Sequence, residues 1–160
     1  MQCACWKKLA DMDRRRKSIK ILFGLYGLMM LWLLLFRRIG SDYGQPGLNL
    51  EPLDTVKRYL WVLQHSTIAA QRQWASANLL GNVGLFLPFG IFLPLLFQSM
   101  KHFWRFLLCA TLSVLTVELL QLLTGLGACD VDDLILNLAG AIAGWLIWKI
   151  GAKRSPGKKQ

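Results

Sequence analysis

The fold is decided by the stretch Asp130-Val-Asp-Asp133-Leu-Ile-Leu-Asn137-Leu-Ala-Gly140-Ala-Ile-Ala-Gly144. Positions 130, 133, 137, 140 and 144 follow one another at intervals of three or four, so a helix places them in one stripe. Apolar residues cover the rest of that helix. Few polar groups with apolar flanks are typical of a bilayer helix whose polar face looks into a bundle. We therefore expect this segment to cross a membrane and to turn its stripe toward other helices.

Four apolar blocks predict that the whole chain is an all-α membrane protein. The chain has 160 residues, of which 54% are hydrophobic. Each block approaches the roughly 20 residues that cross a hydrocarbon core about 30 Å thick. The blocks are residues 19–36, 75–97, 103–126 and 130–150. The sequence thus predicts a polytopic protein with a four-transmembrane-helix bundle.

The distribution of basic residues predicts the orientation of the bundle. Of the 19 Lys and Arg residues, seven lie in residues 1–20, two in 98–105 and five from Lys149 onward. These three regions share one side of a chain that crosses four times, and the positive-inside rule places that side in the cytoplasm. Topology explains the formal net charge of +10, so we expect no nucleic-acid partner. The expected organisation is a cytoplasmic tail (1–18), a membrane domain (19–150) and a second cytoplasmic tail (151–160).

The long outer loop, residues 37–74, is expected to carry a short amphipathic helix. Asp54 is a plausible N-cap for it, and Val56, Leu60 and Leu63 recur at helical spacing. Such a helix would lie on the outer leaflet or cap the bundle. A solvated surface helix fits the same pattern equally well.

Prolines and glycines mark two structural positions. Pro88 and Pro94 interrupt the second block, which predicts a kink or local unwinding there. A break of this kind persists in a membrane only where neighbouring protein satisfies the backbone, so this region, with Gly90 beside it, should face other helices. Gly140 and Gly144 form a G-x-x-x-G pattern, whose simplest interpretation is a close-packing face.

Polar residues in three of the blocks predict an outward-facing pocket. At about 1.5 Å per helical residue, Asn82, Glu118 and Asn137 lie about 10–12 Å below the outer surface. Glu118 is the strongest candidate, because an acid inside a membrane costs at least about 2.5–3.5 kcal/mol on insertion scales. If the three helices converge, the ligand-binding residues are Asn78, Asn82, Glu118, Gln121, Asp130, Asp133 and Asn137.

Apart from Glu118, each of these residues also has a purely structural explanation. Asp130 and Asp133 fit an N-cap followed by an acidic residue in the first turn. The amides fit hydrogen bonds that join helices within the bundle. The four cysteines are scattered, without a companion histidine cluster, so we expect no metal and no cofactor.

The chain resembles the VanZ-like family of small bacterial membrane proteins, over roughly residues 21–150. The resemblance rests on an ordered set of motifs: Asn49-Leu-Glu-Pro52, then Asn78 and Asn82, Phe86-Leu-Pro88-Phe-Gly90, Glu118-Leu-Leu-Gln121, and Asp130 to Gly140. It implies an inner-membrane protein of the cell envelope, connected with glycopeptide susceptibility of the teicoplanin type.

Three functions are compatible with this reading. The first is binding of an envelope molecule, either a glycopeptide or a lipid-linked wall precursor, by a protein that is itself surrounded by membrane lipids. The second is an enzyme acting on a lipid-linked substrate, with Glu118 and Asp133 as an acid–base pair. The third is an ion-coupled transporter or proton relay through Glu118, which would need a homo-oligomer because four helices are few for alternating access.

Overall fold

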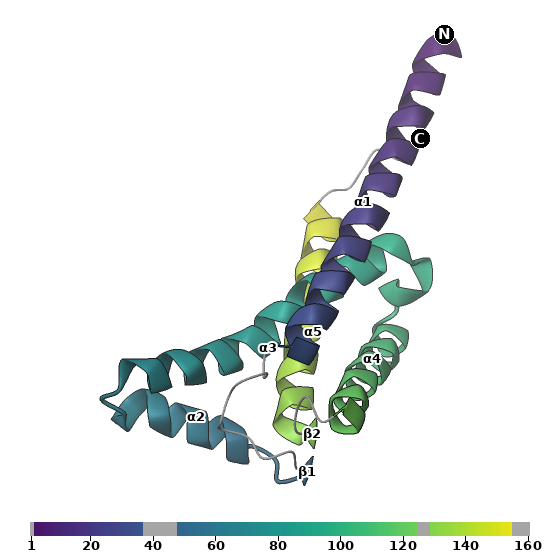
Figure 1. The fold of residues 1–160 in the computed structure, drawn as a ribbon. Coiled ribbons are helices and arrows are strands. Elements are labelled where there is room, and N and C mark those ends of the chain that lie inside the picture. The colour runs from purple at the N-terminus through teal and green to yellow at the C-terminus, as the bar shows by residue number, and fades with distance from the viewer. Residues whose placement is uncertain (1, 37–47, 125–128, 155–160) are drawn as a thin grey trace.

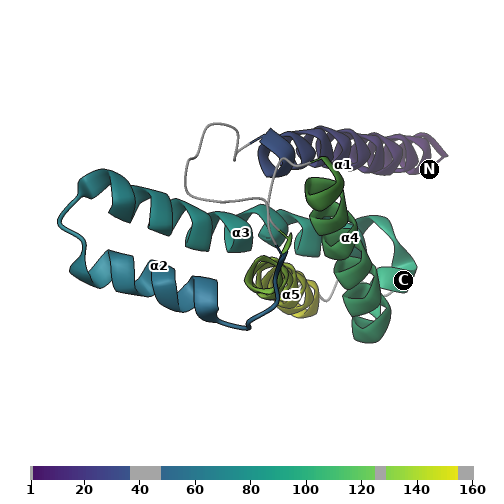
Figure 2. The ribbon, with the colours of Figure 1, turned by 60° about the horizontal axis from the view of Figure 1, so that its bottom comes forward.

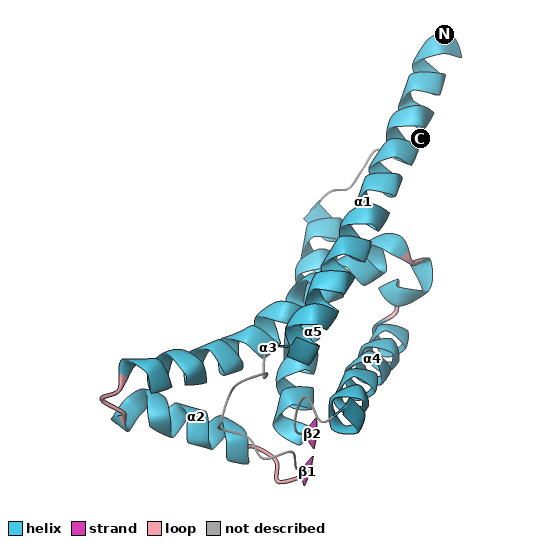
Figure 3. Cartoon of the chain, in the orientation of Figure 1, coloured by secondary structure: helices cyan, strands magenta, loops and turns pink. Residues whose placement is uncertain are grey.

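The computed structural model describes residues 2–36, 48–124 and 129–154, and within them the chain is almost entirely helical (Figure 3). Its helices are α1 (Gln2–Phe36), α2 (Asp54–His65), α3 (Ala69–Leu96), the short 3-10 helix η1 (Gln98–Lys101), α4 (Phe103–Thr124) and α5 (Val131–Arg154). Two short strands, β1 (Leu48–Asn49) and β2 (Cys129–Asp130), pair in parallel. The predicted all-α class is confirmed, and both predicted tails contribute residues to terminal helices.

Three helices are long and apolar enough to cross a membrane. They are α3, α4 and the Val131–Lys153 part of α5. These three spans confirm the predicted membrane protein. The first predicted span, residues 19–36, lies within α1, but the side chains of its last three residues fall outside the described part of the chain. A fourth crossing therefore stays a prediction.

Helices α2 and the first half of α3 form an arm that projects from the other helices (Figures 1 and 2). Helix α3 has 28 residues, or about 42 Å, which exceeds a hydrocarbon core of about 30 Å. Its start at Ala69 lies inside the predicted loop, whose short helix is confirmed as α2. Within the arm, Tyr59 of α2 packs against Trp74 of α3, and the two rings meet edge to face with centroids 5.0 Å apart.

Helix α5 packs along α3 with the two backbones in direct contact. A Cβ atom added to Gly140 or Gly144 would overlap the carbonyl oxygen of Val83 or Leu87, respectively. From the other side, a Cβ on Gly90 would overlap the carbonyl oxygen of Ala141. The predicted close-packing face is thus confirmed, and its partner is the proline-containing helix.

Helix α3 continues through both prolines, so local unwinding is not found, and the alternative expectation, a kink, stays a prediction. Pro88 cannot donate to the carbonyl four residues before it, so the preceding turn needs outside support. The hydroxyl of Tyr26 in α1 donates to the carbonyl of Leu85 in that turn. Gly90 lets α5 approach on the opposite side of the same region. Neighbouring helices therefore contact α3 on both sides of its proline-containing turn.

The glycine contact generates a stability prediction. In Gly140→Ala and Gly144→Ala, the new methyl group collides with backbone that cannot rotate away, and overpacking of this kind costs about 1–3 kcal/mol. We expect both variants to unfold at lower temperature in detergent than the unsubstituted chain.

The matched control is Gly84→Ala, on the partner helix α3, where a new Cβ meets nothing within 4 Å. Because alanine is a better helix residue by about 0.5–1 kcal/mol, this variant should be equally or more stable. Equal unfolding temperatures for Gly84→Ala and Gly140→Ala would contradict the close contact.

Candidate functional site

The part of the site that lies within the membrane spans joins α3 to α5. The side-chain amide of Asn82 donates to Oδ1 of Asp133, and both side chains are buried. The glycine contact explains why these two residues meet, since Val83, next to Asn82, lies against Gly140, about two helical turns after Asp133. The polar faces of α3 and α5 therefore converge at this pair.

Helix α4 reaches the same region through Glu118. Its Oε2 atom accepts the backbone N–H of Asp130 at 3.3 Å, and the Glu118 side chain is only 3% exposed. Oδ1 of Asp130 in turn accepts the N–H of Asp132 at 2.9 Å, which is the bond an N-cap residue makes. The capping interpretation of Asp130 is thus supported by geometry, and α4 is tied to the start of α5.

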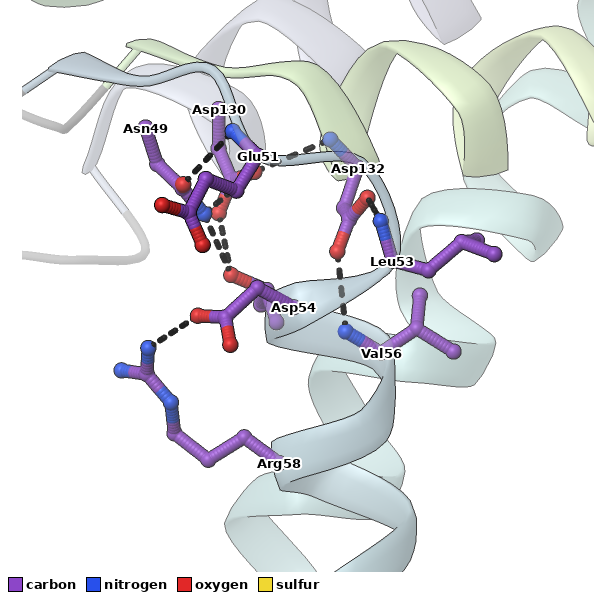
Figure 4. A network of polar contacts seen from close by, with 9 residues as sticks. Asn49, Glu51, Leu53, Asp54, Val56, Arg58, Asp130 and Asp132 are labelled. Carbon is purple, nitrogen blue, oxygen red and sulfur yellow. Dashed lines mark hydrogen bonds and ion pairs between the residues drawn. The ribbon is translucent and has the colours of Figure 1, made fainter.

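Asp130 also binds the segment that precedes α2 (Figure 4). The parallel strand pair places Asn49 opposite Asp130. The hydroxyl of Thr55 donates to Oδ2 of Asp130 at 2.7 Å, and the amide of Asn49 lies 3.3 Å from Oδ1. The same amide donates to the Thr55 hydroxyl oxygen at 3.0 Å. Asp130 therefore has a structural role at the junction of three segments.

Asp132 was missed by the sequence reading, yet it is fully buried and organises α2. Its two carboxylate oxygens accept the backbone N–H groups of Leu53 at 2.5 Å and Val56 at 3.0 Å (Figure 4). These bonds satisfy amides at the start of α2 that have no partner within the helix, and the negative charge suits the helix dipole. The cap of α2 is thus supplied by another helix.

This remote cap corrects the predicted role of Asp54. The N-cap of α2 is Leu53, which makes no side-chain capping bond and has φ of 68°, the left-handed region. Among the described residues, Leu53 is the one non-glycine residue with positive φ. Asp54 is the first helical residue, and its carboxylate binds Arg58 at 2.6 Å on the surface. Local sequence favoured Asp54, but the tertiary contact with Asp132 decides where α2 begins.

All seven predicted site residues are buried. We use the name polar cluster for five of them, which come from the three spans: Asn82, Glu118, Gln121, Asp133 and Asn137. Asn78 lies outside it, one helical turn before Asn82, and donates to the Trp74 carbonyl of its own helix at 2.8 Å. Oδ1 of Asn137 accepts no hydrogen bond from any described residue, although the side chain is only 1% exposed. The cluster therefore retains hydrogen-bonding capacity at Asn137.

The polar cluster offers both hydrogen-bond acceptors and amide donors, and its negative charge favours ligands that donate. It combines two carboxylates with three amides, and no Lys or Arg belongs to it. Among the described residues, His, Cys, Asp and Glu form no group of three or more arranged to hold a metal ion. Such a cluster would recognise hydroxyl, amide or ammonium donors.

The remote cap generates a second prediction. Asp132→Ala leaves the amides of Leu53 and Val56 without acceptors, and the loss of a cap costs about 0.5–2 kcal/mol. We expect faster hydrogen exchange in residues 54–65, with smaller changes in α4. The control is Asp54→Asn, which removes only a surface ion pair worth about 0.2–1 kcal/mol. Unchanged exchange of α2 in Asp132→Ala would contradict the remote cap.

Comparisons with known proteins agree with the motif resemblance. The family model for VanZ/LLP1 matches residues 23–152. Protein VanZ of Enterococcus faecium is 29% identical over 143 residues, covering 86% of this chain and 78% of VanZ. No solved structure matches the chain. The match extends over all three membrane spans and the polar cluster, and the chain belongs to the VanZ/LLP1 family.

Proposed function

We propose that this membrane protein lowers the susceptibility of a bacterium to glycopeptides of the teicoplanin type by binding an envelope ligand at the polar cluster. The observation that carries the proposal is the burial of five polar side chains, from three spans, in one region of a membrane protein. Polar groups inside a membrane are costly and are retained mainly where they serve a function. Membership of the VanZ/LLP1 family supports the connection with glycopeptides.

The arrangement of charge supports an outward-facing cluster. Basic residues are concentrated at the start of α1, in the connection between α3 and α4, and at the end of α5. By the positive-inside rule these regions are cytoplasmic, in the inner membrane of a bacterium. The cluster lies toward the other end of α4 and α5, together with β1 and β2. A ligand would then arrive from the extracytoplasmic side.

The donor and acceptor balance supports a ligand rich in hydroxyl, amide or ammonium groups. Glu118 and Asp133 present carboxylate oxygens, and Oδ1 of Asn137 is a buried acceptor that no described residue uses. Glycopeptides and lipid-linked wall precursors both offer donors of this kind. An acceptor left unsatisfied inside a protein costs about 1–3 kcal/mol, so a donor from the ligand would remove that cost.

An enzyme acting on a lipid-linked substrate is the second candidate. It is favoured by two carboxylates at the start of α5: Asp133 lies in the first turn of α5, and Glu118 of α4 binds the N–H of Asp130 just before that turn. Two acids in different surroundings can divide the roles of general acid and general base. Turnover of labelled precursor by the protein in vesicles would support this candidate over simple binding. Accumulation of an ion or substrate inside the vesicles would support the transporter instead.

The proposed function predicts the effect of two isosteric substitutions. Glu118→Gln and Asp133→Asn keep the shape of the side chains but remove the acceptor charge. We expect the teicoplanin concentration that inhibits growth to fall to that of a strain lacking the protein, while the variants still accumulate in the membrane.

The matched controls are Glu51→Gln and Asp54→Asn. Glu51 is exposed, and the ion pair that Asp54 forms within the described residues is the surface pair with Arg58. Both controls should retain the unsubstituted level of resistance. If Glu118→Gln and Asp133→Asn also retain it, the polar cluster is not the functional site.

A further inference from the structure

A groove on the surface of α4 lies outside the polar cluster and has no role in the proposed function. Its volume is about 460 Å³. Met100 of η1 lines one end, and residues of α4 from Arg105 to Thr116 line the rest. Arg105, Leu108, Leu112 and Thr116 follow one another at intervals of three or four, so they form one face of the helix.

The length of the groove matches one leaflet of a membrane. From Arg105 to Thr116 the helix rises about 16 Å. Half of a hydrocarbon core about 30 Å thick is about 15 Å. Since α4 is a membrane span, a groove along this part of it lies at the depth of the acyl chains of a single leaflet.

The walls of the groove are apolar although Ser113 and Thr116 belong to them. The hydroxyl of Ser113 donates to the Cys109 carbonyl at 2.8 Å. The hydroxyl of Thr116 donates to the Leu112 carbonyl at 2.7 Å. Both hydroxyl protons are therefore used within α4, and the groove presents hydrocarbon surface to its occupant.

One end of the groove is basic and aromatic. Arg105 lines it, and the exposed Lys101 directly follows Met100 in the chain. Trp104, next to Arg105, is 76% exposed, as expected of an aromatic residue at the level of lipid headgroups. This end is also fixed in place, because the indole N–H of Trp145 donates to the Met100 carbonyl at 3.0 Å. Apolar walls ending at positive charge complement a lipid with a negative headgroup.

We infer that this groove binds one acyl chain of an anionic phospholipid, with the lipid phosphate beside Arg105. Guanidinium groups pair with phosphate through two parallel hydrogen bonds. Basic pockets between membrane helices on the cytoplasmic side bind anionic headgroups by the same chemistry. The charge at Arg105 selects the lipid, and the apolar face of α4 holds its chain.

Native mass spectrometry of the full chain in a mild detergent tests the inference, with phosphatidylglycerol or phosphatidylcholine added. We expect the unsubstituted protein to retain about five times as much phosphatidylglycerol as phosphatidylcholine, which is the preference that one basic residue near a membrane surface gives. Arg105→Gln should abolish the preference and Arg105→Lys should keep most of it. Ser113→Phe, which fills the groove, should reduce the retention of both lipids.

The matched control is Lys153→Gln, which removes one charge from the end of α5 that shares a side with the start of α4. It should leave the preference unchanged. Equal retention of the two lipids by the unsubstituted protein would overturn the inference before any variant is made. A preference for phosphatidylglycerol that survives in Arg105→Gln would also overturn it. So would a dimer of the unsubstituted protein that Ser113→Phe dissociates, because a second copy of the chain would then occupy the groove.

Discussion

The structure depends on the direct contact between the backbones of α3 and α5. Lipid surrounds both helices with hydrocarbon, so their association rests on close packing and on polar bonds between them. Gly90, Gly140 and Gly144 remove the side chains that would hold the two backbones apart. Once the helices are this close, Asn82 reaches Asp133, and a buried carboxylate receives a donor from its neighbour. The glycines and the buried polar pair are therefore two parts of one interface.

The acidic start of α5 organises the rest of the end of the bundle that contains β1 and β2. Successive residues of a helix point about 100° apart, so Asp132 and Asp133 face different partners. Asp133 turns toward α3, while Asp132 caps α2 and Asp130 binds Asn49 and Thr55. The polar cluster thus lies beneath a segment whose position is fixed by carboxylates of the same short sequence.

Much of this arrangement follows from the sequence, because helical periodicity and depth are local properties. The five positions of the α5 stripe are all buried, and Asn82 meets Asp133 as convergence requires. Asp132 was missed because it lies off that stripe and its partners, Leu53 and Val56, are distant in the chain. The start of α3 was placed too late since Gln71, Arg72 and Gln73 interrupt the apolar pattern. In each case the determining contact is tertiary, with α2 or α5, and no local pattern encodes it.

A double-mutant cycle between Asn82 and Asp133 tests the central interface most directly. The free energy of unfolding in detergent would be measured for the unsubstituted chain, Asn82→Ala, Asp133→Ala and the double variant. A buried hydrogen-bonded pair across α3 and α5 predicts a coupling energy of about 1–3 kcal/mol, so the double variant should lose less stability than the two single losses together. Additive losses, with no coupling, would contradict the contact on which this account of the bundle and its polar cluster rests.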